Sequence, residues 1–452
     1  MRSYAAAPDP ALTDFGTDPW WIVLIKLVFT FAVGMGLTVL GVWFERRVVA
    51  RMAQRPGLNQ VGPFGLLQTL MDGVKGMLKE DLLPKKADKV VFFFAPAVCA
   101  VFALTSLSII PFAGKVNLFG HVTPMQVTDV PVGALIALAC SSMAVYGIVL
   151  GGWASGSTYP LLGGLRSSAQ MISYEVALGL SLVAVFMTAG TMSTSGIVAA
   201  QAHGTEFTVA GLTLHAPSWY VLLLIPSFLV FLVAAFGETN RAPFDLPEAE
   251  SELVAGYMTE YSSIKFLLYM LSEYVAMVGM SAMITTLFLG GWRAPWPITL
   301  WDGANSGWIG LLWFFGKVLL LLFLFVWVRA TLPRLRYDQF MRFGWKVLLP
   351  INLVWIVVLA GIKTMQNEAA EARTKWLVIA GAVVVLGVVA LLWPNSRKPA
   401  DGEVPLEERL AARPDGAYPV PPLDLQVPPS PRARRAVAER QPANVATHSE
   451  EV

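Results

Sequence analysis

Long apolar runs recur along most of this chain. The run Trp20–Phe44, for example, is interrupted by a single charged residue, Lys26. A helix of about 20 apolar residues crosses the hydrocarbon core of a bilayer, which is roughly 30 Å thick. Because 55% of the 452 residues are hydrophobic and only 14% are charged, the sequence predicts an all-α polytopic membrane protein. The predicted spans are Trp20–Phe44, Val90–Ala113, Val130–Ser155, Ile172–Thr188, Trp219–Phe236, Ile264–Leu289, Gly307–Val328 and Phe343–Ile362.

The composition changes near the C-terminus. Trp376–Trp393 is apolar and predicts a ninth transmembrane helix, whereas the sequence from Pro394 onward is rich in Pro, Ala, Arg and Glu. Such a composition is typical of a disordered tail or of a peptide-like docking strip. We therefore expect four regions, which are an extracytoplasmic N-terminus (1–19), an eight-helix membrane domain (20–362), a connector with the extra helix (363–393) and a tail (394–452).

The distribution of basic residues predicts the orientation. The segment 45–89 is rich in Lys and Arg, whereas the loop Thr191–Ser218 contains neither. Because basic loops stay in the cytoplasm, the N-terminus is expected outside, with the acidic loop and the tail inside. Within the basic segment, Phe64–Lys79 has apolar residues at helical spacing, which indicates an amphipathic helix that lies on the membrane surface or packs on a soluble partner.

An acidic loop, Gly237–Tyr261, separates two of the apolar runs. It contains five glutamates and one aspartate but a single arginine, Arg241. Carboxylates placed so close together beside a membrane titrate as a coupled set, and such a set can pass on protons when a nearby charge changes. The alternative is a solvated loop that caps a helix, because Asp245 and Glu248 flank Pro247 as in a capping box.

Some ionisable residues fall well inside predicted spans, and Glu273, Glu175 and Lys317 are the most informative of them. Glu273 lies about nine residues into its span, roughly 13 Å at 1.5 Å per residue, and Glu175 lies in the fourth span. A carboxyl group at such depth usually belongs to a proton or ion path, the alternative being a neutral, hydrogen-bonded carboxyl that only packs. Lys317 predicts either a counter-charge for one of these glutamates or a lysine that reaches the interface along a tilted helix.

Other kinds of site are disfavoured. The two cysteines, Cys99 and Cys140, cannot supply the four ligands of an iron–sulfur cluster, and all four histidines fall outside the predicted spans. No basic cluster with interleaved aromatic residues suggests a nucleic acid as partner. Any electron carrier is therefore expected on a partner protein or on a diffusing substrate.

Four blocks resemble the H-type membrane subunit of proton-pumping NADH:quinone oxidoreductase, respiratory complex I. The resemblance covers about Trp20–Ile362. The blocks are ERRVVARMAQRPGLNQVGPFGLLQTLMDGVKGMLKED from Glu45, LLGGLRSSAQMISYEVALGL from Leu161, ETNRAPFDLPEAESELVAGYMTEY from Glu238 and RATLPRLRYDQFMRFGWKVLLP from Arg329. The chain departs from the family pattern at Leu58, Gln60 and Ala249.

The resemblance implies a subunit of eight helices that forms the membrane side of a quinone chamber and the first part of a glutamate pathway for protons. Family positions of the quinone chamber match Glu45, Arg46, Arg55, Asp72, Arg241, Arg329, Arg334 and Arg336. Those of the proton pathway match Glu175, Glu238, Asp245, Glu248, Glu250, Glu252, Glu260 and Glu273.

The resemblance also implies where the chemistry resides. Quinone is the substrate, and NADH, FMN and the iron–sulfur clusters are expected on partner subunits, so that this chain carries no redox centre, metal or cofactor. The expected partners are other complex I subunits and the lipid of a bacterial cytoplasmic membrane. Two alternatives remain, namely the equivalent subunit of a membrane-bound hydrogenase and a stand-alone ion transporter. The absence of internal repeats disfavours the transporter.

Overall fold

The computed structural model describes residues 18–202, 219–245, 253–295 and 307–367, with short pieces near these segments and the backbone of 205–209 and 212–216. All of them belong to Met1–Leu392, the first of two units of the chain. The predicted ninth span and the tail lie outside the described residues, as does the middle of the acidic loop.

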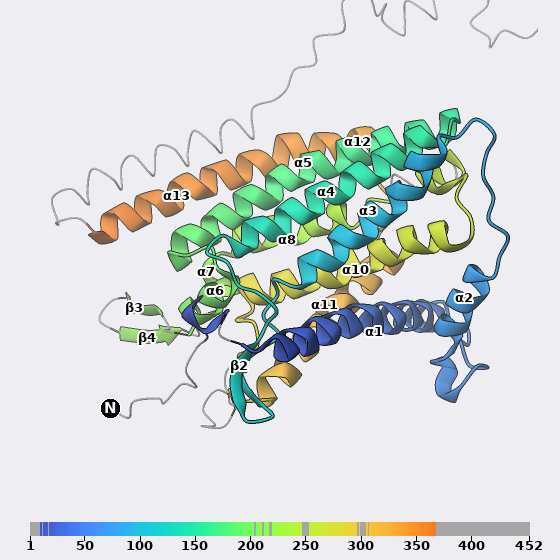
Figure 1. Ribbon diagram of the computed structural model, residues 1–452. Helices are drawn as coiled ribbons and strands as arrows, with labels where there is room; N and C mark the ends of the chain where they lie inside the picture. The colour runs from blue at the N-terminus through green and yellow to red at the C-terminus, as the bar shows by residue number, and fades with distance from the viewer. Residues whose placement is uncertain are drawn as a thin grey trace, which may run out of the picture. The chain divides into compact units, whose positions relative to one another are not determined.

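Helices make up most of the described structure (Figure 1). Seven helical segments are long and apolar enough to cross a membrane, which confirms the predicted fold class. They are α1 (Trp20–Met52), α3 (Lys89–Leu107), α4 (Gly133–Ala154), α5 (Thr158–Ala189), α10 (Ser263–Phe288), α11 (Ile309–Thr331) and the segment Tyr337–Thr364, which joins α12 (Tyr337–Phe343), a π-helical turn (Gly344–Leu348) and α13 (Leu349–Asn367).

Shorter elements connect the long helices. The helices are α2 (Gln68–Met77), α6 (Thr194–Ala200), α7 (Tyr220–Leu223) and α8 (Ile225–Glu238). Two antiparallel hairpins join β1 (Ala113–Leu118) to β2 (His121–Met125) and β3 (Thr205–Val209) to β4 (Leu212–Ala216). In the first hairpin Leu118 pairs with His121 and Ala113 pairs with Met125.

Several predicted span limits differ from the helix limits, and prolines explain two of the differences. The second span ends at Leu107 instead of Ala113, because Pro111 cannot donate the next helical hydrogen bond and disfavours helix at the residue before it. The fifth span is split at Leu224, since Pro226 begins a new helix, α8. The fourth span begins at Thr158, well before Ile172, because polar residues on the first turns of α5 lowered the apolar signal.

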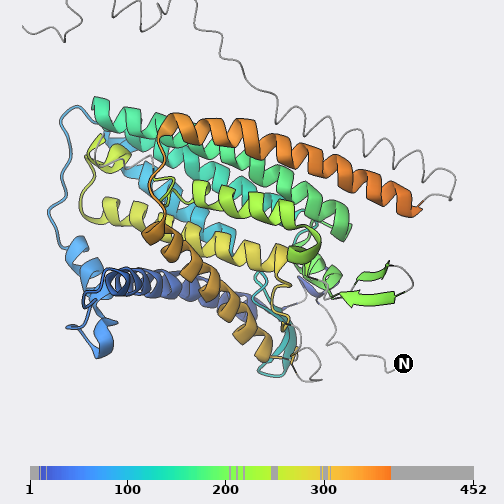
Figure 2. The same cartoon turned by 180° about the vertical axis from the view of Figure 1, so that it is seen from behind.

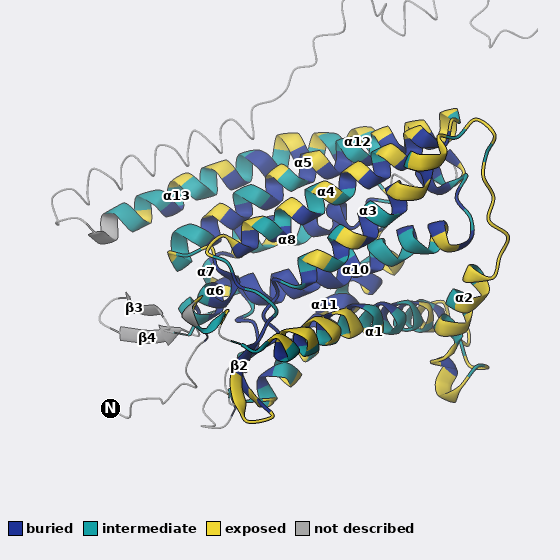
Figure 3. Ribbon diagram, viewed as in Figure 1, coloured by how far each residue is buried: buried dark blue, intermediate teal, exposed yellow. Residues whose placement is uncertain are grey.

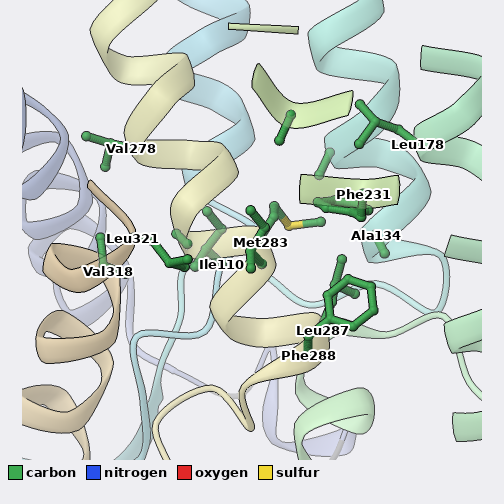
Figure 4. Packing of buried hydrophobic residues seen from close by; sticks show 14 of the residues in the cluster. Ile110, Ala134, Leu178, Phe231, Val278, Met283, Leu287, Phe288, Val318 and Leu321 are labelled. Atoms are coloured by element: carbon green, nitrogen blue, oxygen red, sulfur yellow. The ribbon is translucent and has the colours of Figure 1, made fainter. Parts of the chain in front are cut away.

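Helix α10 occupies the middle of the bundle. It packs against α3 and α8 on one side and against α1 and α11 on the other, and the two opposite views agree on this arrangement (Figures 1 and 2). Buried residues line the inward faces of the helices and exposed residues their outward faces (Figure 3). Figure 4 shows the core around α10, where Met283 and Phe288 lie near Phe231 of α8 and Leu321 lies on α11.

Lys317 on α11 is not the predicted counter-charge for Glu175 or Glu273, because its hydrogen-bond partners are backbone carbonyls. Its Nζ donates to the carbonyl oxygens of Leu289 at 2.6 Å, Gly291 at 2.9 Å and Arg293 at 2.6 Å. The same Nζ lies 4.4 Å from the centre of the Trp219 ring. The ammonium group therefore satisfies carbonyls beyond the C-terminal end of α10 that have no helical partner.

Glycines allow α4 and α5 to approach closely. A Cβ built on Gly152 would lie 2.5 Å from the carbonyl oxygen of Pro160 and 3.3 Å from the Cα of Gly164. Both atoms belong to the backbone of α5, which cannot move aside as a side chain could. The contact between these two spans thus depends on the missing side chain.

We predict that Gly152→Ala destabilises the fold by about 1–3 kcal/mol, the usual range for overpacking. The measurement is the thermal aggregation midpoint of the full-length chain in solubilised membranes. Gly316→Ala on α11 is the matched control, because a Cβ there meets no atom within 4 Å. An unchanged midpoint for Gly152→Ala would show that α4 and α5 separate without cost.

Candidate functional site

A cluster of charged side chains joins α1, α10, α11 and the start of the acidic loop. Its centre is Glu45 near the end of α1, which is only 7% exposed. Arg329 of α11 pairs with Glu45 Oε1. The hydroxyl of Tyr274 on α10 donates to Glu45 Oε2 at 3.0 Å. Burying this carboxylate is feasible because both of its oxygens have polar or cationic partners.

Arg241 lies between two carboxylates that belong to different helices. Its Nη1 is 3.6 Å from Glu45 Oε2, and its Nε is 4.0 Å from Glu273 Oε1. The guanidinium carbon lies 4.0 Å from the centre of the Tyr274 ring, in cation–π geometry. The family resemblance predicts a place in the quinone chamber for Glu45 and Arg241 and a place in the proton pathway for Glu273. Arg241 therefore lies beside one residue from each of these two predicted groups.

The first part of the acidic loop is held by α5. Gln170 Nε2 donates to the carbonyl oxygens of Gly237 at 2.8 Å and Phe244 at 2.9 Å, and to Asn240 Oδ1 at 3.1 Å. Gln170 is completely buried. It thereby fixes the turn that carries Arg241.

The chain after α11 also contacts this part of the loop. The backbone N–H of Leu335 donates to the carbonyl oxygen of Pro243 at 3.1 Å, and Arg334 donates to the carbonyl oxygen of Asp245. Residues on both sides of the acidic loop thus determine where its first turn lies.

The far end of the loop is anchored by Tyr261. Its ring stacks on Phe92 of α3 with centroids 4.0 Å apart, and its hydroxyl donates to the carbonyl oxygen of Gly151 at 3.2 Å. Burial raises the pKa of Tyr261 to about 12, so the hydroxyl remains a donor at neutral pH. Both ends of the acidic loop are therefore fixed on the bundle.

A cavity of about 550 Å³ opens beside Glu45. Its charged lining residues are Glu45, Arg46, Arg55 and Arg329, and Leu58 contributes to its apolar part. Arg46 in turn forms an ion pair with Asp72 at 2.7 Å. Ligand pockets in proteins commonly measure about 300–1,000 Å³, so this cavity is large enough for a ring-sized ligand headgroup.

A second, internal cavity of about 80 Å³ lies among α3, α4, α5, α8 and α10. Glu273, Glu238 and the hydroxyl-bearing Ser141 and Ser272 line it. One water needs roughly 10–15 Å³ of such volume, so the cavity has room for several. Glu238 is 3% exposed. Neither of its carboxyl oxygens has a hydrogen-bond partner within 3.5 Å among the described residues. The carboxyl group of Glu175 and the hydroxyl group of Ser141 are near enough to influence it.

Four other predicted residues, which the structure describes, line neither cavity. Glu175 is half-buried on α5, and Glu260 is half-buried just before α10. Arg334 and Arg336 are exposed, and Arg336 lies 3.6 Å from Asp338. Three loop glutamates, together with the helix predicted to carry them, fall outside the described residues, namely Glu248, Glu250 and Glu252.

The sequence did not single out Gln170 or Tyr274. Gln170 gave only a weak signal, because it is one of several polar residues in the second matching block. Tyr274 gave no such signal, because a tyrosine in a transmembrane helix is common and its contact with Glu45 joins residues 229 positions apart.

Two comparisons with known proteins agree with this architecture. Residues 25–360 match the model of the NADH dehydrogenase family. The chain is also 52% identical over 441 residues to the H subunit of NADH-quinone oxidoreductase from Streptomyces avermitilis, an alignment that covers 96% of this chain and 94% of that protein. Because so little of the chain is left out, most of the region after residue 362 also aligns with this relative. The chain belongs to the family of the NADH-quinone oxidoreductase H subunit and is a membrane subunit of that complex.

Proposed function

We propose that this subunit forms the membrane side of the quinone-binding chamber and the first part of a carboxylate pathway that couples quinone reduction to proton translocation. In this proposal the cavity beside Glu45 receives the quinone headgroup. The internal cavity with Glu273 and Glu238 begins the proton pathway, which continues to Glu175. The observation that carries the proposal is the position of Arg241 between Glu45 and Glu273.

The chemistry of quinone reduction explains why the position of Arg241 matters. A quinone that accepts electrons gains negative charge until it is protonated. A unit charge about 8 Å from Arg241 would interact with it by about 2 kcal/mol at an effective dielectric constant of about 20. Arg241 can pair more closely with Glu45 or with Glu273. An interaction of this size is enough to shift the balance between these two ion pairs, so a charge in the chamber can move Arg241 relative to Glu273.

The electrons must come from partner subunits in this proposal. NADH, FMN and the iron–sulfur clusters are placed on the hydrophilic subunits, which dock on the loops around Arg55 and Asp245 on the cytoplasmic side. The proposed pathway also includes the loop glutamates Glu248, Glu250 and Glu252. A stand-alone ion transporter would not need this dependence on redox partners.

We predict that Glu273→Gln and Glu175→Gln each lower the number of protons translocated per NADH oxidised, because an amide cannot take up and release a proton. The measurement is proton uptake by inverted membrane vesicles, normalised to NADH oxidation. Glu80→Gln serves as the control, since Glu80 is exposed and lines neither cavity. Unchanged stoichiometry in both pathway variants would exclude the proposed pathway.

We predict that Arg241→Lys reduces quinone reduction about tenfold or more. A lysine keeps the positive charge but cannot present separate N–H groups to two carboxylates. NADH oxidation by a hydrophilic artificial acceptor reports on assembly and should remain. The matched control is Arg342→Lys, because Arg342 is exposed on α12 and lines neither cavity. Wild-type rates in the Arg241 variant would contradict the role given to this residue.

We propose further that the region after α13 docks a neighbouring subunit. Truncation after Asn367 leaves the described bundle whole and removes the predicted helix 376–393 and the tail. The yield of intact complex from solubilised membranes is expected to fall. An undiminished yield would show that the extension has another role.

A further inference from the structure

Tyr274 contacts both Glu45 and Arg241, the two residues at the centre of the charged cluster. Its hydroxyl donates to Glu45 Oε2 at 3.0 Å, and its ring centre lies 4.0 Å from the guanidinium carbon of Arg241. The residue is 7% exposed. A single side chain therefore orients the carboxylate with its hydroxyl and supports the arginine with its ring.

The distances show what the hydroxyl does to Arg241. Glu45 Oε2 receives the Tyr274 hydroxyl at 3.0 Å, whereas Arg241 Nη1 lies at 3.6 Å from the same oxygen. The other oxygen is taken by Arg329. With both oxygens engaged, Glu45 does not draw Arg241 into a short, two-pronged pair of the kind that arginine and a carboxylate usually form.

The position of Tyr274 on α10 adds a second constraint. Tyr274 directly follows Glu273, whose Oε1 lies 4.0 Å from Arg241 Nε. Helix α10 thus presents one carboxylate and one aromatic face to the same guanidinium group. Without the hydroxyl, Oε2 of Glu45 would be free to pair closely with Arg241 and to move it away from Glu273.

We propose that Tyr274 is a positioning residue that keeps Arg241 shared between Glu45 and Glu273. This inference rests on the proposed function, because it matters only if charge in the chamber acts on Arg241. Tyr274 contacts neither the substrate nor a transferred proton. It determines where Arg241 lies before negative charge forms on the quinone.

The test is Tyr274→Phe in the assembled complex, which keeps the ring and removes the hydroxyl. The kcat of NADH:quinone reduction is expected to fall about tenfold, since a hydrogen bond to a charged group is lost. The KM for quinone should change less than twofold, and artificial-acceptor activity, used to normalise kcat to assembled complex, should be unchanged. Tyr269→Phe is the matched control on the same helix, because its hydroxyl donates to the Gly147 carbonyl at 3.1 Å, away from the ion pair.

The double variant Tyr274→Phe, Arg241→Lys separates positioning from general support of the fold. If Tyr274 acts through Arg241, adding Tyr274→Phe to Arg241→Lys should lower kcat by less than a further twofold. Wild-type kcat in Tyr274→Phe, equal losses in Tyr269→Phe, or fully additive losses in the double variant would each overturn the inference. If Arg241→Lys alone were fully active, the proposed function itself would fail. If only Tyr274→Phe were fully active, the proposed function would stand and this inference alone would fall.

Discussion

A buried arginine needs negative partners, and this requirement fixes much of the molecule. Arg241 is 6% exposed and reaches Glu45 on α1 and Glu273 on α10. Removing one member of a buried ion pair typically costs about 3–5 kcal/mol. The last turns of α1, the middle of α10, the end of α11 and the turn after α8 are therefore constrained to meet at one point. Glu45 lines one cavity and Glu273 lines the other.

The supporting contacts are of a different kind. Gln170 holds the turn with three hydrogen bonds from one amide, and Gly152 brings α4 and α5 into backbone contact. These contacts are neutral, so a nearby charge changes them less than it changes an ion pair. They hold the bundle around Arg241, which lies 3.6 Å from Glu45 Oε2 and 4.0 Å from Glu273 Oε1.

The sequence predicted the fold better than the site. Apolar runs revealed nearly every span because lipid imposes length and composition directly, and errors arose where prolines such as Pro111 or Pro226 decided a helix end. Acidic residues in apolar surroundings, such as Glu273, were recognisable because their burial is costly. The bridge made by Arg241 and the contact of Tyr274 with Glu45 were not predictable, since they join residues far apart in the chain and depend on how helices pack. Lys317 was misjudged for the same reason.

The amine of Lys317 ties together two parts of the chain that meet only through packing. Its three hydrogen bonds reach the carbonyl oxygens of Leu289, Gly291 and Arg293. Because the donor belongs to α11 and the acceptors follow the last turn of α10, the segment that leaves α10 is held against the side of α11. One side chain thus does at this helix end what a capping residue does within a single helix.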